Sequence, residues 1–278
     1  MKPARIAELL EPFLRAPIPP PGIPTLTKGG HSGFLAEASL AEPFLAKSFS
    51  AKSTTADEPS PKHHRVSAPS VSKQEPAVLS PTQLHHISTY IDILTRWNAR
   101  INLTAIRDPE DIVTRHFGES FFAARLLYPV SSFVPPVVKD VELAASVADL
   151  GSGAGFPGLP LKLWSPQLSL TLIESNHKKA AFLREVTRTL TLTDVNIQNT
   201  RAESLTETFA VVTLRAVERF ESILPTAAAL LAPAGRLALL ISSAQQDQAR
   251  STLPHLAWSN PAPVPHSRSR IVLVGSLT

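Results

Sequence analysis

The sequence predicts an α/β fold with a mostly parallel central sheet and a small helical subregion before it. After residue 145, short apolar runs suited to strands alternate with longer amphipathic runs suited to helices. Such a rhythm is typical of a parallel sheet that helices cover on both faces. Between residues 80 and 130, by contrast, the apolar residues recur only at helical spacing. The sheet is therefore expected in the second half of the chain.

The predicted elements follow one another along the chain. The strands are residues 145–150, 169–174, 194–198, 209–213 and 236–241, and the helices between them are residues 158–164, 177–190 and 220–231. A last strand, residues 270–274, is expected to pair antiparallel with a run near residues 256–258. Upstream, Ser80 is a helix N-cap with proline at the first helical position, and Asp108 caps a second helix that runs from Pro109 toward Leu127.

The first 80 residues differ in composition from the rest and hold 12 of the 26 prolines. Apolar residues recur at helical spacing over residues 4–14, which predicts one short helix there. Residues 16–77 are rich in Pro, Ser and Ala, and they bury too little apolar surface to offset the entropy of ordering. We expect residues 1–79 to be this helix followed by a mobile insertion, and residues 80–278 to be the folded domain.

Composition excludes several classes of protein. The 278 residues contain no cysteine, which rules out a disulfide framework, a cysteine-ligated metal and a thiol nucleophile. The nine histidines show no metal-ligand spacing, so no metal is expected. A net charge of +4 is compatible with a nucleic-acid partner. Because the longest uncharged apolar stretch, residues 222–235, is too short for a bilayer and no signal peptide is evident, we expect a cytoplasmic protein without a membrane partner.

Residues 147–158 carry the strongest local signal. They read VADLGSGAGFPG, a short strand that leads into a glycine-rich turn and then a helix. Glycines allow a tight turn and a close approach of the backbone to a ligand, and the helix N-terminus offers unpaired N–H groups. A tight turn without a ligand is the alternative, but four glycines at a strand end exceed what a turn requires. The pattern indicates a ligand site.

The residues alone leave two ligands open. Gly153, Gly155 and Gly158 satisfy the dinucleotide fingerprint, and Glu174 lies about 20 residues on, where an acid that binds a ribose belongs. The same arrangement also serves S-adenosyl-L-methionine, whose adenosine hydroxyls need the same acid. The motif by itself is compatible with a nicotinamide dinucleotide and with S-adenosylmethionine.

Five blocks of sequence, all in the same order, resemble the bacterial 16S rRNA (guanine(527)-N7)-methyltransferases, the glucose-inhibited-division B family. They are residues 97–109 with 115–117, 149–160, 174–183, 201–203 and 215–217. The match covers roughly residues 80–240, and the helix over residues 4–14 also looks like the start of the family. The resemblance implies a class I, Rossmann-like methyltransferase that uses S-adenosyl-L-methionine to methylate N7 of a guanine in 16S rRNA of the small ribosomal subunit.

The resemblance also implies roles for individual residues. Those that would bind the cofactor are Asp149, Gly151, Gly153, Gly155, Phe156, Glu174, Ala202, Glu203 and Arg215. Within this set, Glu174 should bind the ribose, and Ala202 and Glu203 the edge of the adenine. Arg215 should flank the reactive centre as the catalytic residue, supported by Arg201. The alternative for both arginines is a solvated surface ion pair.

An RNA partner is expected to dock on residues 80–130, beside the cofactor-binding core of residues 145–278. The candidates for RNA contacts are Arg107, Arg115, His116, Lys178 and Lys179. N7 of guanine carries a lone pair and no proton, so its methylation needs no general base, and rate gain must come from proximity and orientation. We expect the enzyme to act as a monomer.

The chain departs from the family pattern at a few positions. The family usually has Asp where this chain has Ala210, a small residue where it has Leu214, and Lys-Gly where it has Ile241 and Ser242; Glu119 replaces an Asp. Two alternatives therefore accompany the methyltransferase hypothesis. One is an NAD(P)-dependent oxidoreductase, and the other is a Rossmann-like binding protein with impaired catalysis.

Overall fold

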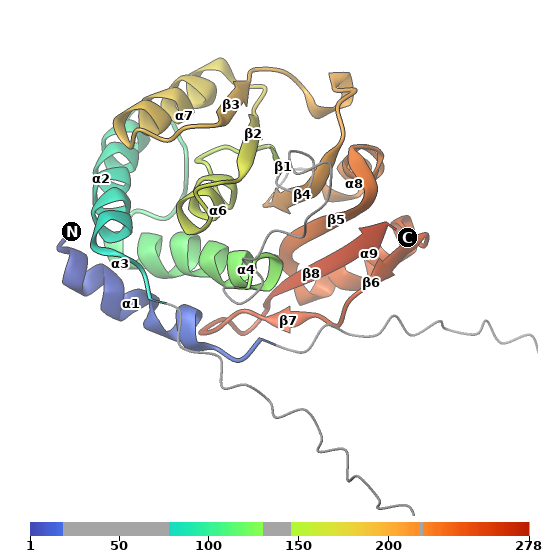
Figure 1. Cartoon of the computed structure of the whole chain (residues 1–278), viewed down its shortest axis with the longest axis horizontal. Coiled ribbons are helices and arrows are strands. Elements are labelled where there is room, and N and C mark those ends of the chain that lie inside the picture. The colour runs from blue at the N-terminus through green and yellow to red at the C-terminus, as the bar shows by residue number, and fades with distance from the viewer. Residues whose placement is uncertain (19–77, 130–145, 217–218, 278) are drawn as a thin grey trace, which may run out of the picture. The chain divides into compact units, whose positions relative to one another are not determined.

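The structure is a computed structural model that describes residues 1–18, 78–129, 146–216 and 219–277. The eight strands among these residues form one sheet (Figure 1). The strands are β1 (Ser146–Leu150), β2 (Ser169–Ile173), β3 (Val195–Gln198), β4 (Phe209–Arg215), β5 (Leu231–Ser242), β6 (Leu256–Trp258), β7 (Ala262–Pro263) and β8 (Arg270–Leu277). Their order is β3-β2-β1-β4-β5-β8-β6, with β7 paired to β8. The α/β fold class is confirmed.

The first five strands are parallel, and β8 is antiparallel to both β5 and β6. The predicted pairing of the last strand with residues 256–258 is therefore correct, and β8 also closes the parallel part of the sheet. The strand order reverses between β1 and β4. In open α/β sheets, ligands bind at such a reversal, outside the carboxyl ends of the strands.

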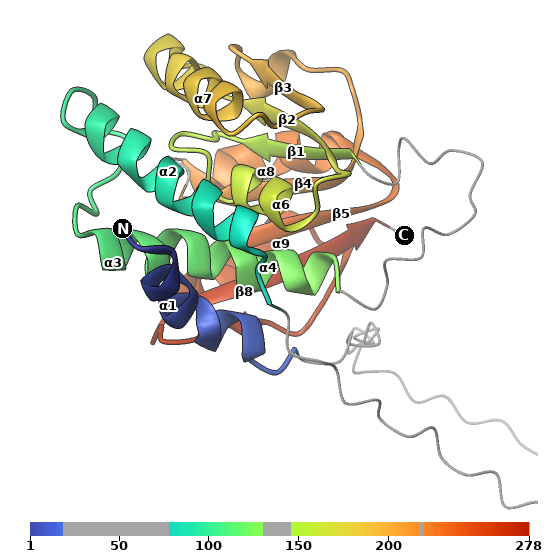
Figure 2. The same cartoon turned by 60° about the vertical axis from the view of Figure 1, so that its left-hand side comes forward.

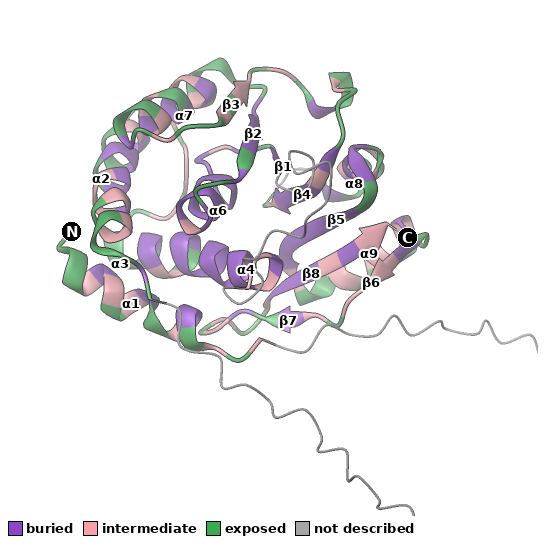
Figure 3. Cartoon of the chain, viewed as in Figure 1, coloured by how far each residue is buried: buried purple, intermediate pink, exposed green. Residues whose placement is uncertain are grey.

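Helices cover both faces of the sheet, as Figure 2 shows for α2, α6 and α8. The helices are α1 (Pro3–Arg15), α2 (Pro81–Asn98), α3 (Pro109–Ile112), α4 (Glu119–Leu127), α6 (Gly158–Trp164), α7 (His177–Thr189), α8 (Phe220–Ala229) and α9 (Gln246–Thr252), with short turns η1 (Val113–Gly118), η3 (Ala202–Ser204) and η4 (Ser243–Gln245). Alternate residues of β5 face opposite sides, since Leu237 and Leu239 belong to the core under α8 and α9, whereas Ala238 belongs to the core under α2, α6 and α7. In Figure 3 the central strands are mostly buried.

The helical subregion begins where its caps predict. Ser80 forms a capping box with Gln83, and Asp108 accepts hydrogen bonds from the N–H groups of Glu110 and Asp111. The helix predicted from Pro109 to Leu127 is not uniform, however, because η1 is a π-helical turn between α3 and α4. The hydrophobic spacing could not reveal this wider turn. Such turns often mark functional sites.

The sequence placed the start of α6 correctly but missed that of β5. The helix predicted over residues 158–164 is α6 (Gly158–Trp164), and the Phe156–Pro157 peptide bond before it is cis. The strand predicted at residue 236 already begins at Leu231, directly after α8. Residues 227–233 are an apolar run that suits a helix or a strand equally, and periodicity alone cannot separate the two. Neither α9 nor β7 was predicted.

The predicted mobile insertion, residues 16–77, lies outside the described residues except for residues 16–18. The described residues all belong to one compact unit, in which α1 packs against α2, η1 and α4. The division of the chain at residue 80 stays a prediction. Among the helices of the described part, none is long and apolar enough to cross a membrane.

Candidate functional site

The glycine-rich turn connects β1 to α6 at the carboxyl edge of the sheet, beside the reversal of strand order. Gly151, Gly153 and Gly155 all have positive φ, at 67°, 55° and 83°. Residues other than glycine rarely adopt this backbone conformation, which explains the glycines at these positions. A Cβ at Gly155 would also overlap the hydroxyl oxygen of Tyr90. The turn is therefore fixed by backbone conformation and by close packing beneath it.

Glu174 follows β2 directly and faces the turn. One carboxylate oxygen accepts a hydrogen bond from the N–H of Gly153 (2.9 Å), and the other accepts one from the N–H of Asn176 (2.7 Å). The side chain is 6% exposed. Since a carboxylate offers about four acceptor sites, those that remain can accept hydrogen bonds from the two hydroxyls of a ribose. The sequence predicted this juxtaposition of turn and acid.

Asp149 lies under the turn and contacts protein groups. The residue is 1% exposed, one carboxylate oxygen accepts a hydrogen bond from the Thr213 hydroxyl (2.7 Å), and the other accepts one from the N–H of Gly158 (3.3 Å). It thus ties β1 to β4 and to the start of α6. Burial raises the pKa of Asp149 to about 6.

This buried carboxyl predicts a pH dependence of stability. Because it holds its proton up to about pH 6 in the folded protein but only to about pH 3.8 when unfolded, its burial costs free energy above pH 6, and the cost is relieved as the pH falls. The wild type therefore gains stability as the pH falls from 7 to 4. The substitution Asp149→Asn removes the titrating carboxyl and with it this gain in stability. Between pH 7 and pH 4, the free energy of unfolding of the variant should fall relative to wild type by about 2 kcal/mol. Urea unfolding at each pH measures this free energy, and a substitution at an exposed acid, Asp247→Asn, is the control. If the free energy of unfolding of Asp149→Asn and of wild type changes equally with pH, the pKa of Asp149 is not raised.

The positive φ of Gly153 makes a second prediction. A Cβ there would meet only the Gly151 carbonyl oxygen, at 3.7 Å, so backbone conformation and not space excludes a branched side chain. Gly153→Val should distort the turn, withdraw the N–H from Glu174 and weaken cofactor binding roughly tenfold or more. Gly153→Asn is the control, because Asn tolerates a left-handed backbone and should bind nearly as wild type does. Calorimetric titration with S-adenosylmethionine measures the affinity of each variant. Normal binding by Gly153→Val would show that the turn does not need a left-handed backbone at this position.

Aromatic rings support the turn from the helical subregion. The Tyr90 hydroxyl donates to the Ala154 carbonyl (2.5 Å), and the Tyr90 ring stacks on Phe156 with centroids 5.4 Å apart. The His116 ring also stacks on Phe156, at 4.7 Å, and Phe117 meets it edge-on at 5.1 Å. Phe156, predicted at the cofactor, is 5% exposed. Tyr90 was not predicted at this site, because in the sequence it is one more core residue of a helix.

His116 differs from the other candidates for RNA contacts, because it is buried. Its Nε2 is 2.8 Å from the Thr104 hydroxyl, and its other nitrogen is buried without a partner among the described residues. Burial, followed by the positive charges of Arg215, Arg115 and Arg270, lowers the pKa of His116 to about 3. The ring is therefore neutral and enclosed by protein.

Arg215 ends β4 with its side chain only 11% exposed. Its guanidinium donates to the Arg115 carbonyl (2.7 Å) and forms an ion pair with Glu119 (3.0 Å), itself 8% exposed. This burial lowers the pKa of Arg215, an effect that Glu119 opposes. The alternative of a solvated surface ion pair is thus wrong for Arg215. Glu119 was noted in the sequence only as a substitution, and its contact with Arg215 could not be foreseen.

The remaining candidates lie at the surface or just beneath it. Arg201 is exposed, and its side chain has no partner within the described ranges. Ala202 is 7% exposed in η3, and Glu203 beside it is exposed. The exposed or half-buried residues predicted to contact RNA are Arg107, Arg115, Lys178 and Lys179. The last two open α7, whose N-cap Asn176 also donates to Glu174, so they lie at the same edge as the turn.

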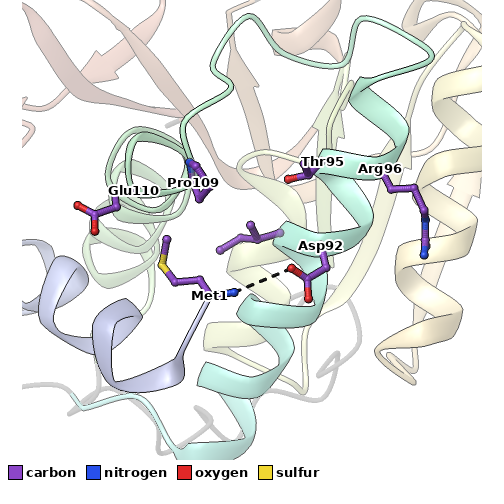
Figure 4. Close-up of a pocket in the computed structure, with 7 residues that line it drawn as sticks. Met1, Asp92, Thr95, Arg96, Pro109 and Glu110 are labelled. Carbon is purple, nitrogen blue, oxygen red and sulfur yellow. Dashed lines mark ion pairs between the residues drawn. The ribbon is translucent and has the colours of Figure 1, made fainter.

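A hollow of roughly 600 Å³ lies elsewhere, between α1, α2 and the start of α3 (Figure 4). Met1, Asp92, Thr95, Arg96 and Glu110 line it with Pro109 and Ile91, and the Met1 amino group is 3.9 Å from Asp92. It contains no residue of the glycine turn. In the described portion of the chain, no group of three or more His, Cys, Asp or Glu side chains could hold a metal.

The strand order, the glycine turn and Glu174 together define a class I methyltransferase fold. A solved magnesium protoporphyrin IX methyltransferase from Synechocystis PCC 6803, with bound SAM, has the same fold. It superposes with a TM-score of 0.51 at 13% sequence identity, over 69% of this chain and 97% of that one. The predicted fold class is confirmed.

The sequence comparisons identify the family. The model of rRNA small subunit methyltransferase G matches residues 83–259, and the chain belongs to this family. The ribosomal RNA small subunit methyltransferase G of Xylella fastidiosa is 38% identical over 60% of this chain and 72% of its own length. That of Halorhodospira halophila is 39% identical over 61% and 75%. The family resemblance is confirmed, and an NAD(P)-dependent oxidoreductase is not favoured.

Proposed function

We propose that this protein transfers a methyl group from S-adenosyl-L-methionine to N7 of a guanine in 16S rRNA of the small ribosomal subunit. The observation that carries the proposal is the hydrogen bond between Glu174 and the glycine turn, at the reversal of strand order in a chain of the methyltransferase G family. The proposed enzyme is a cytoplasmic monomer that uses no metal.

The residues at the sheet edge fit the cofactor. Glu174 would accept hydrogen bonds from the ribose hydroxyls, and Ala202 and Glu203 would contact the adenine. Gly151, Gly153 and Gly155 would let the amino-acid end approach the backbone, over Phe156 and with Asp149 beneath them. When bound, S-adenosylmethionine supplies a methyl group on a positively charged sulfur.

The protein's own residues would contribute orientation and no proton transfer. N7 carries no proton, so the described residues need not supply a base. Arg215 cannot stabilise the cofactor's sulfonium, because like charges repel. Held by Glu119 and the Arg115 carbonyl, it would orient the RNA or the cofactor carboxylate, with Arg201 in support. Its planar guanidinium suits bidentate contacts.

The RNA would bind across the helical subregion and the start of α7. Arg107, Arg115, Lys178 and Lys179 offer positive charges there for phosphate groups. His116 would act indirectly, because it is buried and stacks on Phe156 of the cofactor turn. The deep, narrow major groove of A-form RNA hides N7 from side chains, so an unpaired guanine in a loop is the expected substrate.

Radiolabelled S-adenosylmethionine tests the proposal with two RNA substrates. Small subunits from cells that lack the endogenous methyltransferase, and 16S rRNA freed of protein, are incubated with the enzyme. Label in 16S rRNA of either substrate is the expected result, and the ratio of the two rates identifies the preferred form. A folded enzyme that binds S-adenosylmethionine but labels neither substrate would favour the impaired binding protein.

A further inference from the structure

A second arginine lies beside Arg215 at the carboxyl edge. Arg270 is the first residue of β8 and pairs in register with Ser242 at the end of β5. Its guanidinium donates to the Leu240 carbonyl (3.0 Å) and lies 3.6 Å from the same Glu119 oxygen that pairs with Arg215. Two guanidinium groups therefore share one carboxylate.

Among the described residues, this arrangement leaves one guanidinium without an ion-pair partner of its own. Glu119 is 8% exposed, and the side chains of Arg215 and Arg270 are 11% and 27% exposed, so solvent compensates the excess poorly. Asp149, whose charge also acts on Arg215, forms no ion pair with either arginine among the described residues. The lowered pKa of His116 responds to the same arginines. An anion that reached this point would be bound in a favourable field.

Residues with unused hydrogen-bond donors line a small opening there. Arg215, Arg270 and Gln245 line a space of roughly 20 Å³ together with the apolar Leu214, Phe220 and Ile241. That volume is about enough for one water-sized group, such as an oxygen of a phosphate. The Gln245 oxygen accepts from Ser242, and its amide nitrogen has no partner within the described residues. Likewise, Nε and Nη1 of Arg270 bond to nothing in the described part.

The position of these donors separates them from the ribose site. Glu174 follows β2, whereas Arg270 begins β8, and β1, β4 and β5 lie between those two strands. At about 4.8 Å per strand, the separation is roughly 19 Å across the sheet. The opening thus lies at the β4, β5 and β8 end of this edge, on the side of β4 away from Glu174.

We infer that Arg270, with Gln245 and Arg215, forms a subsite for a phosphodiester group of the RNA substrate. The inference rests on the proposed function, since RNA supplies the phosphate. Arg270 would take the phosphate and leave Glu119 to Arg215, which would then be held by a full ion pair. The other source of an anionic oxygen is the carboxylate of the cofactor, and the experiment separates the two.

The test compares Arg270→Gln with Arg268→Gln, an exposed arginine two residues away that has no described partner. The affinity of both variants for protein-free 16S rRNA is measured at several concentrations of KCl between about 50 and 200 mM, because the salt dependence of the affinity reports the number of phosphate contacts. We expect Arg270→Gln to weaken binding about tenfold and to reduce the slope of log affinity against log salt by about one, as for one lost phosphate contact. Arg268→Gln should leave both unchanged.

Titration with S-adenosylhomocysteine and with methylthioadenosine, which lacks the carboxylate, completes the test. If Arg270→Gln weakens only S-adenosylhomocysteine, Arg270 binds the cofactor carboxylate and the phosphate subsite is refuted. An unchanged salt slope also refutes it, and then Arg270 only ties β8 to Glu119. If Arg270→Gln does not fold, Arg270→Lys takes its place. It keeps the charge but not the planar donor pair, so it should weaken RNA binding severalfold at an unchanged slope, and an affinity equal to that of wild type refutes the subsite. Because these readouts are binding constants, they hold even if wild type methylates no 16S rRNA.

Discussion

Arg215→Lys should lower the rate of methyl transfer in a single turnover roughly 10²-fold, while the affinity for S-adenosylmethionine changes little. The guanidinium is fixed by two groups of the helical subregion, the Arg115 carbonyl and the Glu119 carboxylate. A lysine has one nitrogen and cannot keep both contacts while it presents a planar donor pair to a substrate. Misorientation by about 1 Å is enough to produce a loss of this size.

Rapid-quench methylation of small-subunit RNA measures this effect, together with a cofactor titration and a thermal melt. The matched control is Arg184→Lys on the exposed face of α7, which should be silent. Since Glu119 is buried, Arg215→Ala should also destabilise the fold, and only the lysine variant separates chemistry from folding. Equal single-turnover rates for Arg215→Lys and wild type would remove Arg215 from the catalytic residues.

Glu174→Gln should weaken S-adenosylmethionine binding about 10- to 100-fold, as expected for the loss of a charged acceptor of hydrogen bonds. An amide keeps one oxygen, but its NH₂ group faces the N–H of Gly153 or of Asn176, so one end of the turn loses its partner. Glu174→Ala, which removes both oxygens, should weaken binding further. Calorimetry measures the affinities.

Glu207→Gln, an exposed acid near the start of β4, is the control for the change in net charge. It should bind the cofactor as wild type does. Affinity for S-adenosylmethionine that survives Glu174→Gln unchanged would mean that the ribose is held elsewhere, and the assignment of this edge as the cofactor site would fail.

Much of the fold could be predicted because its signals are local. Alternating apolar runs identified β1 to β4, and Ser80 and Asp108 mark helix starts with their own side chains. The π-helical turn η1 escaped prediction, because its apolar residues Val113 and Phe117 are four apart, a spacing that a regular helix would also show. The start of β5 at Leu231 was missed for a related reason, since that short apolar run has no period of its own.

The candidate site divides in the same way. Glycines before a helix and an acid after the next strand form a local sequence pattern. Gly153 and Glu174 were therefore predicted, and they form a hydrogen bond. Glu119 and Arg270 were not foreseen, because each reaches Arg215 through a long-range contact that leaves no trace in local sequence. Tyr90 was hidden among core residues of α2 for the same reason.

Nucleoside analysis of the methylated RNA identifies the atom that receives the methyl group. Small subunits that lack the modification are incubated with the enzyme and S-adenosylmethionine, and the 16S rRNA is digested and separated by mass-resolved chromatography. We expect about one 7-methylguanosine per 16S rRNA and none without cofactor, because the described residues orient a base without taking its proton. Methylation at another atom or another nucleoside, or none by a folded enzyme that binds the cofactor, would contradict this expectation.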